Sequence, residues 1–186
     1  YALLYPILAA ILSYSLCDVE YKNYGFRLLF TRPISKLTIY SSKMVFLLEI
    51  NFISFLIGYL AFLLSGFALD KLLPGYEFSS YNVNNLTAFY FSYLFIALSA
   101  VSIMQYYLSL IFKSFVLPIG FAGFMTIFGV IAQNKDYIYL IPYGTVWRLN
   151  YGFYSGIIDF SKGEYLNISC VLFFIIISFF VFIRKK

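Results

Sequence analysis

The sequence predicts an all-α polytopic membrane protein, and three observations support this fold class. Of the 186 residues 62% are hydrophobic and only 11% are charged, whereas soluble domains carry about 25% charged residues. The mean hydropathy is +0.86, and a small soluble domain exposes too much of its surface to hide so many apolar side chains. Apolar runs of about 20 residues, the length that crosses a hydrocarbon core, recur without the alternation of a lipid-facing strand.

Five apolar runs qualify as spans. Helices suit them because a helix satisfies its own backbone hydrogen bonds in lipid. The first run opens the given sequence without a Met, and we expect further chain upstream of Tyr1. The predicted spans are Tyr1–Cys17, Met44–Gly66, Leu86–Phe112, Ser114–Ala132 and Leu166–Ile183.

The charged residues predict how these spans are oriented. Alternating the sides places one group of connecting segments together, and this group holds nine cations against two acids. The other group, Phe67–Asn85 and Gln133–Tyr165, holds four cations against five acids. Because cytoplasmic loops carry an excess of Lys and Arg, Asp18–Lys43, Lys113 and Arg184–Lys186 are predicted to be cytoplasmic. The net charge of +5 thus reflects topology rather than a phosphate-binding face, and no nucleic-acid partner is expected.

The two outer segments differ in kind. The shorter contains Pro74-Gly75 and is expected to form a loop. The longer, Gln133–Tyr165, is rich in aromatic residues, and two interpretations stay open. It is either a loop anchored in the outer interface by Tyr and Trp side chains or a functional re-entrant segment that enters the membrane as short helices. Pro142, Gly144, Gly152 and Gly156 are expected to interrupt such helices.

The cation-rich segment Glu20–Lys43 has the pattern of an amphipathic helix that lies in the membrane plane. Pro33 disfavours helix at the preceding residue and suits the first turn of a new helix. We therefore expect two short helices, Glu20–Thr31 and Pro33–Lys43, the second running into the span at Met44. An ordinary positive-inside loop is the alternative. The apolar face comprises Phe26, Leu29, Phe30, Pro33, Ile34 and Leu37.

A longer pattern in this region carries a resemblance. It consists of Pro6, Glu20-Tyr21-Lys22-Asn23, Gly25, Leu28-Leu29, Arg32-Pro33-Ile34-Ser35-Lys36, Ile39-Tyr40 and Lys43. The pattern resembles the cytoplasmic signature of ABC type-2 transporter permeases. Within that family it is closest to the branch associated with lantibiotic immunity and bacitracin-type peptide export. Such permeases typically have six spans, so the resemblance implies that the five runs seen here lack the first.

The resemblance implies that Glu20–Thr31 is a coupling helix, which docks into a separate cytoplasmic ABC ATPase. That ATPase would hold ATP and Mg, and this chain would bind no cofactor itself. A second permease subunit, identical or not, would complete the pathway, with membrane lipids around both. The candidate coupling residues are Glu20, Lys22, Gly25, Phe26, Arg27, Leu29, Phe30, Arg32, Pro33, Lys36 and Lys43.

The function implied by the resemblance is that of a permease subunit of an ATP-driven exporter in the bacterial cell membrane. The substrate would be amphipathic or peptide-like, with antimicrobial-peptide immunity or drug resistance as a use. The alternative is a non-transporting membrane anchor or assembly subunit of a larger complex. Catalysis by the chain itself is not expected, because it has no His for a Ser–His site and no Gly-x-x-x-x-Gly-Lys-Ser/Thr run to hold nucleotide phosphates.

Three polar residues inside the predicted spans are candidates for the pathway or for contacts between helices. Glu49 is the only acid there, and an intramembrane carboxylate is a functional candidate. Alternatively, Glu49 pairs with Lys43 or reaches toward water. Asn51 and Gln105 suit hydrogen bonds between helices better than substrate ligation. No metal site is expected.

Overall fold

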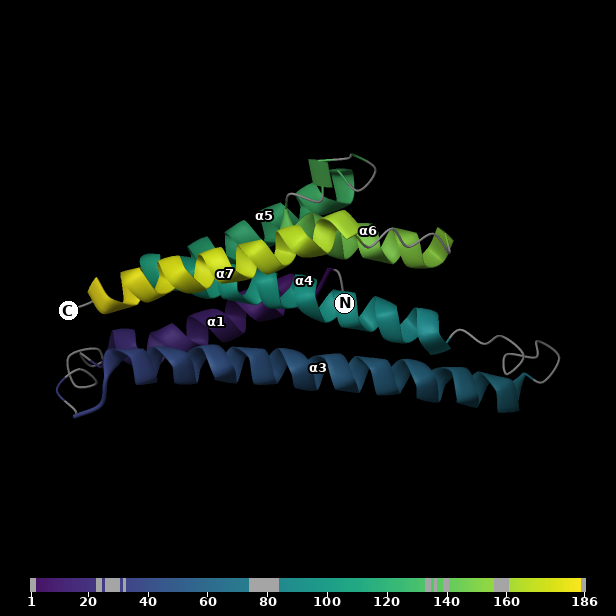
Figure 1. Cartoon of the computed structure of the whole chain (residues 1–186), viewed down its shortest axis with the longest axis horizontal. Helices are drawn as coiled ribbons and strands as arrows, with labels where there is room; N and C mark the ends of the chain where they lie inside the picture. The colour runs from purple at the N-terminus through teal and green to yellow at the C-terminus, as the bar shows by residue number, and fades with distance from the viewer. Residues whose placement is uncertain are drawn as a thin grey trace.

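The computed structural model of the chain is helical throughout its regular structure (Figure 1). It describes residues 3–22, 25, 31, 33–73, 84–132, 135, 137–138, 141–155 and 161–184. Within these residues there are six helices and no strand, which confirms the all-α prediction. The helices are α1 (Tyr5–Tyr21), α3 (Lys36–Leu72), α4 (Asn84–Ile111), α5 (Val116–Ala132), α6 (Pro142–Ser155) and α7 (Ser161–Arg184).

Three of the described helices are long and apolar enough to cross a membrane, namely α3, α4 and α7. The apolar helix α5 is shorter, with 17 residues, and α1 also has 17. Together they define a multi-pass membrane protein. The helix α3 has 37 residues and is roughly 55 Å long at the usual rise per residue, well beyond a hydrocarbon core of about 30 Å. It therefore tilts in the bilayer or extends past it.

The helix α4 forms the centre of the molecule. The helices α1, α3, α5, α6 and α7 all pack against it, and Figure 1 shows it running between α3 and α7. Its packed surface contains small side chains, such as Ala97, Ala100 and Ser102, which let neighbouring helices approach closely.

The cation-rich segment differs from its prediction at both ends. The helix α1 continues through Glu20 to Tyr21 and ends because Lys22 is extended, so Glu20 closes α1 rather than opening a separate helix. On the far side, α3 begins at Lys36 instead of Pro33. The reason is a cap: the Ser35 side chain accepts a hydrogen bond from the backbone N–H of Thr38 at 3.0 Å. As predicted, this helix runs on without a break through Met44.

The segment before the last apolar helix, which is predicted to lie on the outer side, contains a packed helix. Pro142 begins α6 instead of interrupting it, because proline is tolerated in the first turn. Gly144 lies inside α6, where an added Cβ would stand 2.2 Å from the Cδ1 of Ile138. At Gly129 of α5 an added Cβ would stand 2.9 Å from the Trp147 ring. Glycine at these two positions thus allows the close packing of α5, α6 and the turn between them.

The three segments predicted to share one side of the membrane lie at the same end of the molecule. The Tyr21 hydroxyl donates to the carbonyl oxygens of Ser109 and Leu110 near the end of α4, at 2.8 Å each. The Tyr14 hydroxyl donates to the carbonyl oxygen of Lys113 at 2.9 Å. In Figure 1 the end of α7 and the start of α3 both lie at the left end, and Lys36 donates to the carbonyl oxygen of Ile183.

Candidate functional site

An ion pair joins the two ends of the cation-rich segment, Glu20 and Lys43. The Glu20 Oε1 of α1 lies 2.6 Å from the Lys43 Nζ of α3, and the two side chains are only 10% and 13% exposed. The same Nζ donates to the carbonyl oxygen of Leu16 at 2.7 Å. Glu20 extends the buried face of α1 that already contains Ser13 and Cys17, so the helical period directs it inward. We call this ion pair the clasp.

The clasp lies at the edge of the predicted spans, three residues after Cys17 and directly before Met44. Burial raises the pKa of the Glu20 carboxyl, and the hydrogen bond and positive charge of Lys43 oppose that rise. The second carboxylate oxygen of Glu20, Oε2, is buried and has no hydrogen-bond partner within the described part of the chain. An unpaired carboxylate oxygen in such a place is costly unless another group satisfies it.

A second ion pair, between Asp18 and Lys22, lies near the clasp and is more exposed to solvent. The Lys22 Nζ lies 2.5 Å from Asp18 Oδ2, and 69% of the Lys22 side chain is exposed. The hydrogen bond to Asp18 raises the pKa of Lys22. An exposed pair of this kind contributes little to stability, because water screens the two charges. Lys22 thus presents a positive charge at the surface, whereas Glu20 and Lys43 face inward.

The other predicted coupling residues fall into two groups. Gly25 lies against the end of α1, where an added Cβ would stand 2.9 Å from the Cα of Glu20. Pro33 is exposed, and Lys36 donates from Nζ to the carbonyl oxygen of Ile183 at the end of α7, at 3.0 Å. Phe26, Arg27, Leu29, Phe30 and Arg32 lie outside the described residues.

The polar span residues Asn51 and Gln105 both form hydrogen bonds between helices. The Asn51 Oδ1 of α3 accepts from the Tyr5 hydroxyl of α1 and from the Ser102 hydroxyl of α4, the latter at 3.1 Å. The Gln105 Nε2 of α4 donates to the Tyr143 hydroxyl of α6. Each of these two side chains is more than nine-tenths buried, and each joins helices that are distant in sequence.

Glu49 has different surroundings from the other two polar residues. Its side chain is exposed, and within the described part of the chain it forms no ion pair. The suggested partner, Lys43, bonds to Glu20 instead, so the alternative that paired Glu49 with Lys43 is wrong. The reason is helical phase: on α3 the buried stripe runs through Met44, Leu47 and Asn51, and Glu49 lies off that stripe.

Several polar residues in the core were missed by the sequence reasoning. The Tyr40 hydroxyl of α3 donates to the Ile175 carbonyl oxygen at 2.7 Å and lies 2.6 Å from the Ser178 hydroxyl, both in α7. The Ser13 hydroxyl of α1 donates to the Ser102 carbonyl oxygen at 3.2 Å. A signal for the α4 face was present in the sequence. Polar residues recur there every three or four positions, at Ser99, Ser102, Gln105 and Ser109.

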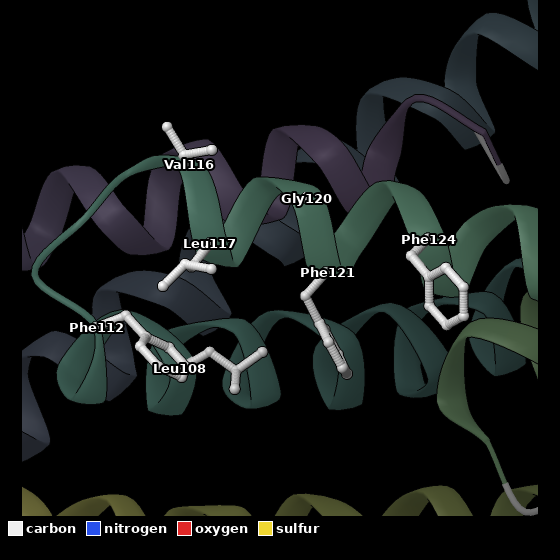
Figure 2. A pocket seen from close by; sticks show the side chains of 7 residues that line it. All are labelled: Leu108, Phe112, Val116, Leu117, Gly120, Phe121 and Phe124. Atoms are coloured by element: carbon white, nitrogen blue, oxygen red, sulfur yellow. The ribbon is translucent and has the colours of Figure 1, made fainter.

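Two grooves among the described residues are similar in size, and only one of them contains charged side chains. One has a volume of about 460 Å³ and lies between α4 and α5, and Figure 2 shows the side chains that line it. Its lining is apolar throughout: Leu108, Phe112, Val116, Leu117, Gly120, Phe121 and Phe124. The other, of about 450 Å³, lies between α1 and α3 and contains the clasp. No group of three or more His, Cys, Asp or Glu side chains suited to a metal ion occurs among the described residues.

The long apolar helices, the polar contacts between them and the charged end define a multi-pass membrane protein with an ion pair at the base of one cation-rich loop. The family model described as ABC-2 family transporter protein matches residues 1–129, which extend from before α1 into α5. The chain therefore belongs to the ABC-2 transporter family, as a membrane subunit of an ABC transporter. No curated protein and no solved structure gives a significant match.

Proposed function

We propose that the chain is the permease subunit of an ATP-driven exporter that moves an amphipathic or peptide-like substrate out of the cell. A separate cytoplasmic ATPase holds ATP and Mg, and a second permease subunit completes the pathway. Membership of the ABC-2 family supports the permease role. The motif between Pro6 and Lys43 supports the peptide-exporting branch, with immunity to antimicrobial peptides as its use. The apolar groove between α4 and α5 suits the hydrocarbon part of such a substrate.

The end of the molecule that carries the cation-rich segment is assigned to the cytoplasm. The excess of nine cations over two acids in its segments supports this orientation. It places Lys22 and the C-terminus on the side where an ATPase would meet them. Lys71, near the end of α3, then lies at the outer face.

The clasp is the observation that carries the proposed mechanism. Because Glu20 ends α1 and Lys43 lies in the second turn of α3, their ion pair joins the two helices from which the segment emerges. A push by an ATPase on the segment reaches α1 and α3 together rather than bending one of them. Two further bonds extend the path, from Tyr21 to the end of α4 and from Lys36 to the end of α7. Docking itself rests on shape and apolar contact, because each surface ion pair is worth below about 1 kcal/mol.

The experiment compares two double variants that each remove one cation and one Phe. Arg27→Ala with Phe30→Ala changes the proposed docking segment, and Lys71→Ala with Phe67→Ala changes the opposite end of α3, where the Lys71 Nζ lies 4.6 Å from the centre of the Phe67 ring. Both are reconstituted with the ATPase in vesicles, and ATP hydrolysis and movement of a fluorescent amphipathic peptide are measured. The first variant is expected to transport about tenfold less peptide per ATP hydrolysed. The second is expected to match the wild type.

Two outcomes decide against the proposal. Equal coupling in the Arg27/Phe30 variant and the wild type would overturn the docking assignment. A wild-type complex that hydrolyses ATP but moves no peptide would overturn peptide export and favour a non-transporting anchor or assembly subunit.

A further inference from the structure

The groove between α1 and α3 combines an apolar wall with a buried charge pair. Its volume is about 450 Å³. One stretch of wall is apolar and comes from both helices, and Glu20 and Lys43 lie at one end. The lining residues are Leu12, Ser15, Leu16, Val19, Glu20, Lys43, Phe46 and Ile50.

The ion pair in this groove leaves one hydrogen-bond acceptor on Glu20 and one donor on Lys43 for a ligand. Among the residues that the structure describes, the Oε2 of Glu20 has no partner, although Glu20 is only 8% exposed. The last side-chain torsion of a glutamate is soft, so the proposed site requires the carboxylate to rotate and present this oxygen to the groove that Glu20 lines. The Lys43 ammonium has three N–H donors, and two of them are used, by Glu20 Oε1 and by the Leu16 carbonyl oxygen. One acceptor and one donor therefore lie side by side.

The position of the pair along the helices sets the depth of the groove in the bilayer. Glu20 follows the predicted span that ends at Cys17, and Lys43 precedes the one that begins at Met44. Lipid headgroups occupy this level, whereas the apolar wall from Leu12 to Val19 extends into the hydrocarbon region. A ligand with a polar end at the clasp and an apolar tail along the wall fits both parts.

We propose that this groove binds one phospholipid whose headgroup carries a protonated amine with at least one N–H, as in phosphatidylethanolamine. The ammonium donates to the Glu20 carboxylate, the phosphate accepts from the third N–H of Lys43, and an acyl chain lies along the apolar wall. A zwitterionic headgroup matches the pair in charge, with each of its ends facing the opposite sign. Phosphatidylcholine lacks the N–H that the carboxylate requires, and phosphatidylglycerol offers no cation to it. The site does not depend on the exporter function.

The first test is a headgroup series on the purified, delipidated chain, followed by native mass spectrometry. Lipids with identical acyl chains carry an ethanolamine with zero, one, two or three N-methyl groups. Binding is expected to persist while one N–H remains and to fall at least about tenfold at the third methyl, because a hydrogen bond to a charged group is lost there. Equal affinity for phosphatidylethanolamine and phosphatidylcholine, or a preference for phosphatidylglycerol, would overturn the proposal.

The second test fills the groove without touching the clasp. Val19→Trp places a large side chain in the groove, and Val45→Trp makes the same change at an exposed position of α3 that does not line it. Loss of phosphatidylethanolamine binding is expected for Val19→Trp only. Unchanged lipid binding in Val19→Trp, combined with loss of the ATPase from the purified complex, would assign the groove to the ATPase instead.

Glu20→Gln tests the charge itself, since an amide keeps the size of the side chain. The preference for phosphatidylethanolamine over phosphatidylcholine is expected to drop close to one. Retention of the full preference would overturn the role of the carboxylate. If this variant does not fold, the headgroup series on the wild-type chain decides alone.

Discussion

The helices α3 and α4 are both long apolar spans, yet they occupy opposite places in the molecule. Of the most apolar window of α3 only 6% is buried, whereas 67% of the corresponding window of α4 is buried. The more apolar of these two windows, that of α3, is the exposed one. In water this order would be reversed, because burial of apolar surface drives folding there. Lipid is as apolar as a protein core, so hydropathy does not decide which helix is central.

Packing and hydrogen bonds between helices determine that α4 rather than α3 is central. The helix α4 presents small and polar side chains that allow close approach and bond to its neighbours, such as Ala97, Ser102 and Gln105. The helix α3 joins the other helices along one narrow stripe that includes Met44, Leu47 and Asn51. The rest of α3 is covered with exposed Leu, Ile and Phe side chains, which lipid solvates well.

The largest expected effect is on the free energy of unfolding, when the same Ile→Ala change is made on α3 and on α4. Ile103 of α4 is fully buried, and Ile57 of α3 is 60% exposed. Ile103→Ala is expected to lower the free energy of unfolding by about 2–4 kcal/mol, because it leaves a cavity among packed side chains. Ile57→Ala is expected to change it by less than about 0.5 kcal/mol, since lipid replaces the lost contacts. Unfolding of the purified chain in mixed micelles measures both values.

Equal losses in these two variants would contradict the difference between α3 and α4. A large loss for Ile57→Ala that appears only at high protein concentration would instead indicate that a second subunit covers this face of α3.

A smaller effect is expected where α3 meets the centre of the molecule. Asn51→Leu removes the acceptor for the Tyr5 hydroxyl, and Tyr5→Phe removes the donor. A double-mutant cycle of the two changes is expected to give a coupling energy of about 1 kcal/mol, the size of hydrogen bonds between helices in membranes. Ser65→Ala is the control on the same helix, because that hydroxyl bonds only to the Phe62 carbonyl oxygen within α3. Additive effects of Asn51→Leu and Tyr5→Phe would show that this contact does not hold α3.

The smallest effect is expected at the exposed start of α3. Lys36 places its ammonium 3.0 Å from the Ile183 carbonyl oxygen, at the negative end of the α7 dipole. Lys36→Met is expected to cost about 0.5 kcal/mol at low ionic strength and less at 1 M salt, where the Debye length is about 3 Å. Unfolding measured at both salt concentrations checks this. A loss that does not depend on salt would show that the alkyl chain, not the charge, joins α3 to α7.

More of the fold than of the candidate site could be predicted from the sequence. The helical class followed from the length of the apolar runs, and the prediction that Asp18–Lys43, Lys113 and the C-terminal tail share one end agrees with the bonds of Tyr14, Tyr21 and Lys36. The partner of Lys43 was not predictable. Glu20 is 23 positions away in sequence, and the amphipathic pattern predicts it in a separate surface helix, Glu20–Thr31. The nearer acid, Glu49, lies on another face of α3.

By itself the sequence determined that the chain crosses a membrane as helices, because lipid offers no partner for backbone N–H and C=O groups and each apolar run must satisfy its own. It also determined that the helix after Pro33 runs on without a break through Met44. Only the tertiary structure decided that α4 is central, that Glu20 pairs with Lys43 and that α6 packs inside. These features depend on how side chains of different helices fit together and on single hydrogen bonds between distant residues. The hydropathy of the sequence predicts neither.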